Sequence, residues 1–73
     1  MYNIELNVAD INIVMKDRIE NAAEANGCEI TYNGLDHLVI LNKDCGFDKF
    51  KKTIDDIVYI CAFYGVRYES LLV

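Results

Sequence analysis

The chain opens with a strict alternation of apolar and polar side chains. In YNIELNV, residues 2–8, every second residue is apolar, which is typical of a strand with one buried face. From residue 11 the apolar positions recur at helical spacing instead, at Ile11, Val14, Met15, Ile19, Ala22 and Ala25. We expect Asp10 to cap this helix by accepting hydrogen bonds from its first amides. Gly27 is expected to end the helix in a left-handed conformation.

A hairpin is predicted after this helix. CEITY, residues 28–32, reads as a strand, and LDHLVILN, residues 35–42, reads as the next one. Between them, Asn33-Gly34 is a strong signal for a two-residue turn. Such a turn would place Tyr32 opposite Leu35.

Every residue of the segment 38–41 is apolar, so it offers no polar side to solvent. With the two-residue turn, Val39 and Leu41 point toward the core. Leu38 and Ile40 then point outward in the middle of the sheet, because side chains alternate along a strand. We expect these two side chains to need cover from outside the domain.

The second helix is predicted over residues 47–64. Its apolar stripe recurs at spacings of three and four, at Phe47, Phe50, Ile54, Ile57, Cys61 and Tyr64, as expected for a helix that packs on a core. Gly65 is expected to stop this helix. The remaining segment, VRYESLLV, reads as a last strand.

These elements predict a single domain over residues 1–73. The order strand, helix, strand, strand, helix, strand favours an α+β, ferredoxin-like βαββαβ sandwich. In that fold a four-stranded antiparallel sheet carries two helices on one face, with its first and third strands in the centre. The alternative is a three-stranded α+β fold whose last segment is a loose tail.

Three apolar residues of the second helix fall outside its core stripe. At 100° per residue, Phe63 lies about 180° from Ile54, with Tyr59 at about 140° and Ile60 at about 240°. Burying a Phe side chain contributes roughly 1.5–3 kcal/mol, so a small domain gains by covering it. We therefore expect Tyr59, Ile60 and Phe63, with Leu38 and Ile40, to form a protein interface. A symmetric homodimer is the simplest version; scattered apolar surface residues are the ordinary alternative.

Negative charge is concentrated in the first half of the chain. The whole protein has a net charge of −5, residues 1–36 account for all of it, and residues 37–73 are neutral overall. Direct nucleic-acid binding is disfavoured, because phosphate contact needs a basic patch. We expect an acidic partner surface, or else an ordinary solvated face, at Asp17, Glu20, Glu24, Glu29 and Asp36. Arg18 interrupts the apolar stripe of the first helix at its flank, where it either extends along the helix to reach solvent or pairs with an acid.

The sequence contains no recognisable catalytic or metal-binding motif. His37 is the one histidine, and the spacings of Cys28, Cys45 and Cys61 match neither a disulfide framework nor a CxxC metal pair. Cys45 precedes a helix, where thiol pKa values fall, but no base or orienting group accompanies it. We therefore expect a protein that is not an enzyme and that needs no cofactor or metal.

These observations favour a small acidic protein-interaction module. The most specific hypothesis is an inhibitor that binds a basic, nucleic-acid-binding protein, as phage proteins of the anti-restriction or anti-CRISPR type do. The alternative is a homodimeric regulatory domain that binds a small ligand. We expect no membrane contact, because the longest apolar run covers only residues 57–66. Since the start of the chain lacks the features of a signal peptide, a cytoplasmic location is expected.

Overall fold

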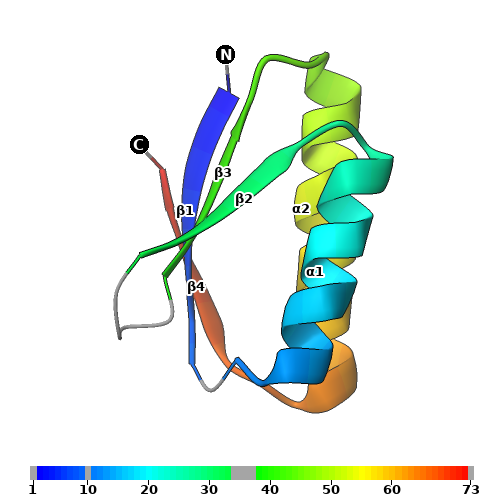
Figure 1. Cartoon of the computed structure of the whole chain (residues 1–73). Coiled ribbons are helices and arrows are strands. Elements are labelled where there is room, and N and C mark those ends of the chain that lie inside the picture. Colours follow the sequence, from blue (N-terminus) through cyan, green and yellow to red (C-terminus); the bar gives the residue numbers. More distant parts are fainter. Residues whose placement is uncertain (1, 10, 34–37, 73) are drawn as a thin grey trace.

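The computed structural model describes residues 2–9, 11–33 and 38–72. Six elements follow one another: β1 (Tyr2–Val8), α1 (Ile13–Ala25), β2 (Glu29–Asn33), β3 (Leu38–Lys43), α2 (Phe47–Tyr64) and β4 (Tyr68–Leu72). The strands form one antiparallel sheet in the order β2-β3-β1-β4. Both helices lie on the same face of it (Figure 1). An α+β fold with four antiparallel strands and two helices is thus confirmed. The three-stranded alternative is wrong, because β4 pairs with β1.

The core lies between the sheet and the helices. Strand β1 contributes Ile4, Leu6 and Val8, all buried, as its alternating pattern predicts. The side chains that join them from the helices and from the rest of the sheet are Met15, Ile19, Ala23, Cys28, Val39, Leu41, Phe50, Ile57 and Cys61. This single cluster is the main source of stability in so short a chain.

Helix α1 begins later than predicted. Its N-cap is Asn12, whose side-chain oxygen accepts a hydrogen bond from the Met15 amide at 2.9 Å. The expected cap at Asp10, which lies outside the described residues, is therefore wrong. The buried stripe of the helix is Met15, Ile19 and Ala23. Val14, which was predicted to be buried, is exposed. The buried residues of the helix are four positions apart, and Val14 lies beside this stripe and not on it.

Both helices end in the same way, with a glycine in the left-handed conformation. Gly27 has φ 75° and Gly65 has φ 67°, as predicted. After α1, the Cys28 amide donates to the Ala23 carbonyl at 2.7 Å, and after α2 the Val66 amide donates to the Cys61 carbonyl at 2.9 Å. These are the bonds of the Schellman motif, and they fix the direction in which each following strand leaves.

The β2–β3 hairpin has a different register from the predicted one. Tyr32 is paired with Val39 and not with Leu35, and residues 34–37 lie between the last pair, Asn33 and Leu38. The predicted two-residue turn is therefore wrong, and the partner of Tyr32 lies four residues further along the chain than predicted. Because four is even, the side chains keep their predicted faces, and Val39 and Leu41 are both fully buried.

Helix α2 has the predicted bounds, and three of its predicted core residues are buried, but Thr53 takes the place of Ile54 in the buried stripe. The buried positions are Phe50, Thr53, Ile57 and Cys61, whereas Ile54 and Tyr64 are only partly buried. Phe47, predicted to be in the core, is 55% exposed. The sequence pattern passed over Thr53 because it is polar. Its hydroxyl donates a hydrogen bond to the Lys49 carbonyl of the same helix at 2.9 Å, so burial of the side chain leaves no unpaired polar group.

Candidate protein-interaction surface

The outer side of α2 carries two large, exposed aromatic rings. Tyr59 is 69% and Phe63 is 68% exposed, and because they are four residues apart they are neighbours on one side of the helix. The outward orientation predicted for these two residues is confirmed. Ile60 differs, since it is half-buried and packs against the core. It can contribute only its outer edge to a contact.

Arg18 of α1 reaches across to the same region of α2. Its guanidinium carbon lies 6.0 Å from the ring centroid of Phe63 and 6.0 Å from that of Tyr64. The two rings meet edge to face, with centroids 5.1 Å apart and planes at 75°. This is cation–π geometry, a contact that neither of the two alternatives predicted for Arg18 from the sequence included. We call Arg18, Tyr59, Phe63 and Tyr64 the aromatic–arginine face.

The predicted acidic residues do not share one surface. Asp17, Glu20 and Glu24 are exposed on α1. Glu29 is also exposed, but it alternates along β2 with Ile30, which packs against the core, and so faces the side of the sheet that the helices leave open. The sheet therefore separates Glu29 from the acids of α1, and Asp36 lies outside the described residues.

Two of the α1 carboxylates lie close enough to Tyr32 of β2 to affect its ionisation. Burial, with smaller contributions from Glu20 and Asp17, raises the pKa of Tyr32 to about 12. Lys16 lies over the ring, with its Nζ 4.8 Å from the centroid. Among the residues that the structure describes, the Tyr32 hydroxyl has no hydrogen-bond partner although it is buried.

Tyr32→Phe is therefore expected to be neutral or slightly stabilising at pH 7, because it removes a buried hydroxyl that has no partner. The two proteins should diverge at alkaline pH. A raised folded-state pKa means that the fold favours neutral Tyr32, so wild-type stability should fall as pH rises from about 10 to about 12, by about 1–2 kcal/mol after allowance for solvent screening. Urea unfolding of both proteins between pH 8 and 12 measures this. Parallel loss in both would contradict it.

The open face of the sheet offers less apolar area than the sequence suggested. Ile40 is half-buried, and its neighbours across the sheet are Glu5 on β1 and Thr31 on β2. The backbone of Leu38 pairs with Asn7, but its side chain lies outside the described part of the chain. Ile40 is thus flanked by polar residues, and the aromatic–arginine face is the stronger candidate.

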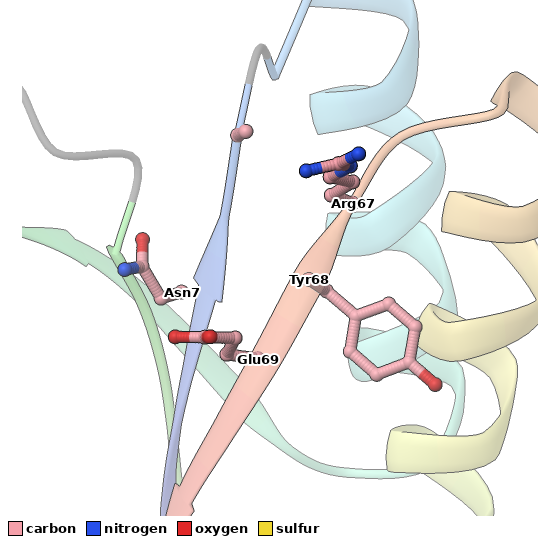
Figure 2. A pocket seen from close by; sticks show the side chains of 5 residues that line it. Asn7, Arg67, Tyr68 and Glu69 are labelled. Carbon is pink, nitrogen blue, oxygen red and sulfur yellow. The ribbon is translucent and has the colours of Figure 1, made fainter.

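A shallow hollow lies where β4 begins beside the end of β1. It has a volume of about 180 Å³ and is lined by Asn7, Ala9, Arg67, Tyr68 and Glu69. Figure 2 shows Asn7 and Glu69 on one side of the strands, with the Tyr68 ring directed away from them. Because small-molecule sites usually measure about 300–1,000 Å³, this hollow is too small to make a ligand site by itself.

Within residues 2–9, 11–33 and 38–72, no group of three His, Cys, Asp or Glu side chains could hold a metal ion. The described helices include none that is long and apolar enough to cross a membrane. His37 lies outside the described residues. Cys28 and Cys45 are brought together, with their sulfur atoms 3.7 Å apart, a contact that the sequence spacing did not indicate.

Comparison with known proteins adds no family to this picture. No protein-family model matches the chain, and no curated protein matches it. The chemistry of the protein surface is therefore what indicates a function.

Proposed function

We propose that this protein is a non-enzymatic protein-interaction module that docks through the aromatic–arginine face. The exposure of Tyr59 and Phe63 carries the proposal, since each exposed ring forgoes a burial contribution of roughly 1.5–3 kcal/mol. Tyr and Arg are also among the residue types that dominate the binding energy of protein interfaces. Arg18 is held over the rings before binding, so less side-chain freedom is lost when a partner docks.

Charge favours a basic partner over a second copy of the chain. Two exposed rings of about 150–250 Å² each cover less than the about 800 Å² per partner that a stable complex buries. Residues outside the aromatic–arginine face must therefore contribute to the contact. Self-association would bring together two chains with a net charge of −5 each, whereas a basic partner would be attracted by the exposed carboxylates Asp17, Glu20 and Glu24.

The most specific form of the proposal is an inhibitor of a nucleic-acid-binding protein. Such proteins present basic grooves that neutralise phosphates, and an acidic protein with an apolar anchor can occupy the same groove. Anti-restriction and anti-CRISPR proteins of phages act in this general way, and the likeness is one of chemistry alone.

We also infer that the fold is a ferredoxin-like sandwich. The strand order β2-β3-β1-β4, with the first and third strands in the centre, supports this assignment, as does the placement of both helices on one face (Figure 1). The fold itself does not distinguish the interaction module from the rival function, a homodimeric regulatory domain with a small ligand. That rival predicts a dimer and a bound metabolite.

A matched pair of variants, Phe63→Gln and Phe47→Gln, tests the proposal. Both residues are exposed phenylalanines of α2, about 24 Å apart along the helix axis. Glutamine adds no charge, whereas aspartate at position 63 would also oppose the helix dipole. Immobilised wild-type protein would be used to capture partners from an extract of the source cell, and the captured protein would then be purified.

The captured protein should be basic, and wild-type chain should displace labelled nucleic acid from it. We expect Phe63→Gln to weaken its binding by about 30-fold or more, as loss of a hot-spot residue does, and Phe47→Gln to change it by less than about twofold. Affinity should also fall as salt is raised. Equal losses in both variants, or capture of a protein that keeps its nucleic acid, would overturn the proposal. A dimer with a bound metabolite would favour the rival function.

A further inference from the structure

Two thiols from different connections of the fold meet at one end of the sandwich. Cys28 directly precedes β2 and Cys45 lies between β3 and α2, and their Sγ atoms are 3.7 Å apart although the residues are 17 positions apart in sequence. This is van der Waals contact between two sulfur atoms. Neither cysteine forms a disulfide in this structure.

The backbone holds each cysteine in place. The Cys28 amide bonds to the Ala23 carbonyl in the α1 stop, and Cys45 directly precedes Gly46, the N-cap of α2. Because both segments are anchored by regular structure, the fold brings the two backbones together, and rotation of the two side chains sets the remaining sulfur–sulfur distance.

We propose that Cys28 and Cys45 form an oxidation site that closes to an intramolecular disulfide when the protein meets a small disulfide such as oxidised glutathione. A disulfide bond is about 2.05 Å long, so the sulfurs must approach by about 1.6 Å, a distance that rotation of the two side chains can supply. The inference is independent of the proposed function, since neither cysteine belongs to the aromatic–arginine face.

The order of the two exchange steps follows from the difference in exposure between the two thiols. Cys45 is half-buried and Cys28 is buried, so the Cys45 thiolate attacks the small disulfide, forms a mixed disulfide and releases one glutathione thiolate. The Cys28 thiolate then attacks Sγ of Cys45 and releases the second glutathione. The protein loses two electrons and two protons, and both protons end on the released thiols. The Thr53 Oγ1 atom lies 3.2 Å from Cys28 Sγ. Its single proton, which bonds to the Lys49 carbonyl, can turn to the Cys28 thiolate when that thiolate forms in the second step.

Cys61 provides a built-in control. It is fully buried in the core stripe of α2, and burial raises the pKa of its thiol. A buried thiol with a raised pKa is a poor nucleophile. The third cysteine is therefore expected to remain reduced under conditions that oxidise the other two.

The test is incubation of the full chain with a mixture of reduced and oxidised glutathione at pH 8, followed by alkylation and intact mass measurement. The wild-type protein should become a monomer that lacks two hydrogen atoms and carries one alkyl group. Trypsin should then release the peptide of residues 19–43 joined to that of residues 44–49, with the Cys61 peptide alkylated. Cys61→Ser should form the same cross-link and carry no alkyl group, whereas Cys45→Ser should form no cross-link.

A persistent glutathione adduct in the wild-type protein, a bond to Cys61, or a disulfide between two chains would each overturn the proposal. These outcomes are read from the wild-type protein, so the result stands even if a variant fails to fold. The oxidised protein should also melt about 10 °C or more above the reduced protein, because the bond closes a loop of about 18 residues and restricts the unfolded chain. An oxidised protein that melts no higher than the reduced one would show that the native thiols are not positioned for the bond.

Discussion

Val39→Lys is expected to unfold the domain, whereas Ile40→Lys, one position later on the same strand, is expected to leave it folded. Val39 is fully buried between the sheet and the helices. A lysine there would place its charge among the apolar side chains of the core, and an uncompensated buried charge costs roughly 3–5 kcal/mol or more. That is most of the stability of a small domain, which is about 5 kcal/mol at the low end of the usual range.

Ile40 faces the other way. It is half-buried on the open side of the sheet, directly across from Glu5 of β1. A lysine at this position can reach solvent and pair with that carboxylate, since opposite charges across strands stabilise by about 0.2–1 kcal/mol. Circular dichroism and thermal melts of the two variants provide the comparison. If both variants unfold, or both melt like wild type, the assignment of the two sheet faces is incorrect.

Leu6→Ala is expected to produce the largest loss of stability among conservative substitutions in β1. Leu6 is fully buried on a central strand, between β3 and β4. Truncating a buried leucine removes its transfer free energy and leaves a cavity, which together cost about 2–5 kcal/mol. For a domain of this size the melting temperature should fall by about 10 °C or more.

Ile13→Ala is the control for this prediction. Ile13 is also a large aliphatic residue, but it is 78% exposed in the first turn of α1. Its truncation should change the free energy of unfolding by less than about 0.5 kcal/mol. Urea unfolding of both variants would measure the difference. Equal effects would mean that β1 does not form the centre of the core.

The hydrophobic pattern predicted the parts of this fold that depend on local geometry. Strand β1 and helix α2 have the expected bounds, and both glycine stops are in place. The hairpin register could not be predicted, because the alternation of side chains specifies a face but not a partner, and a shift by four residues satisfies it equally well. The α1 cap was missed because Asp10 and Asn12 are both good caps by residue type.

For the candidate surface, the sequence by itself determined that Tyr59 and Phe63 lie outside the core stripe, since the angle between helix positions follows from the helix repeat alone. Only the tertiary structure placed Arg18 over Phe63 and Tyr64 and brought Cys28 to Cys45. These contacts join elements that are distant along the chain. Their geometry follows from how the helices and connections pack on the sheet, and no local periodicity encodes that packing.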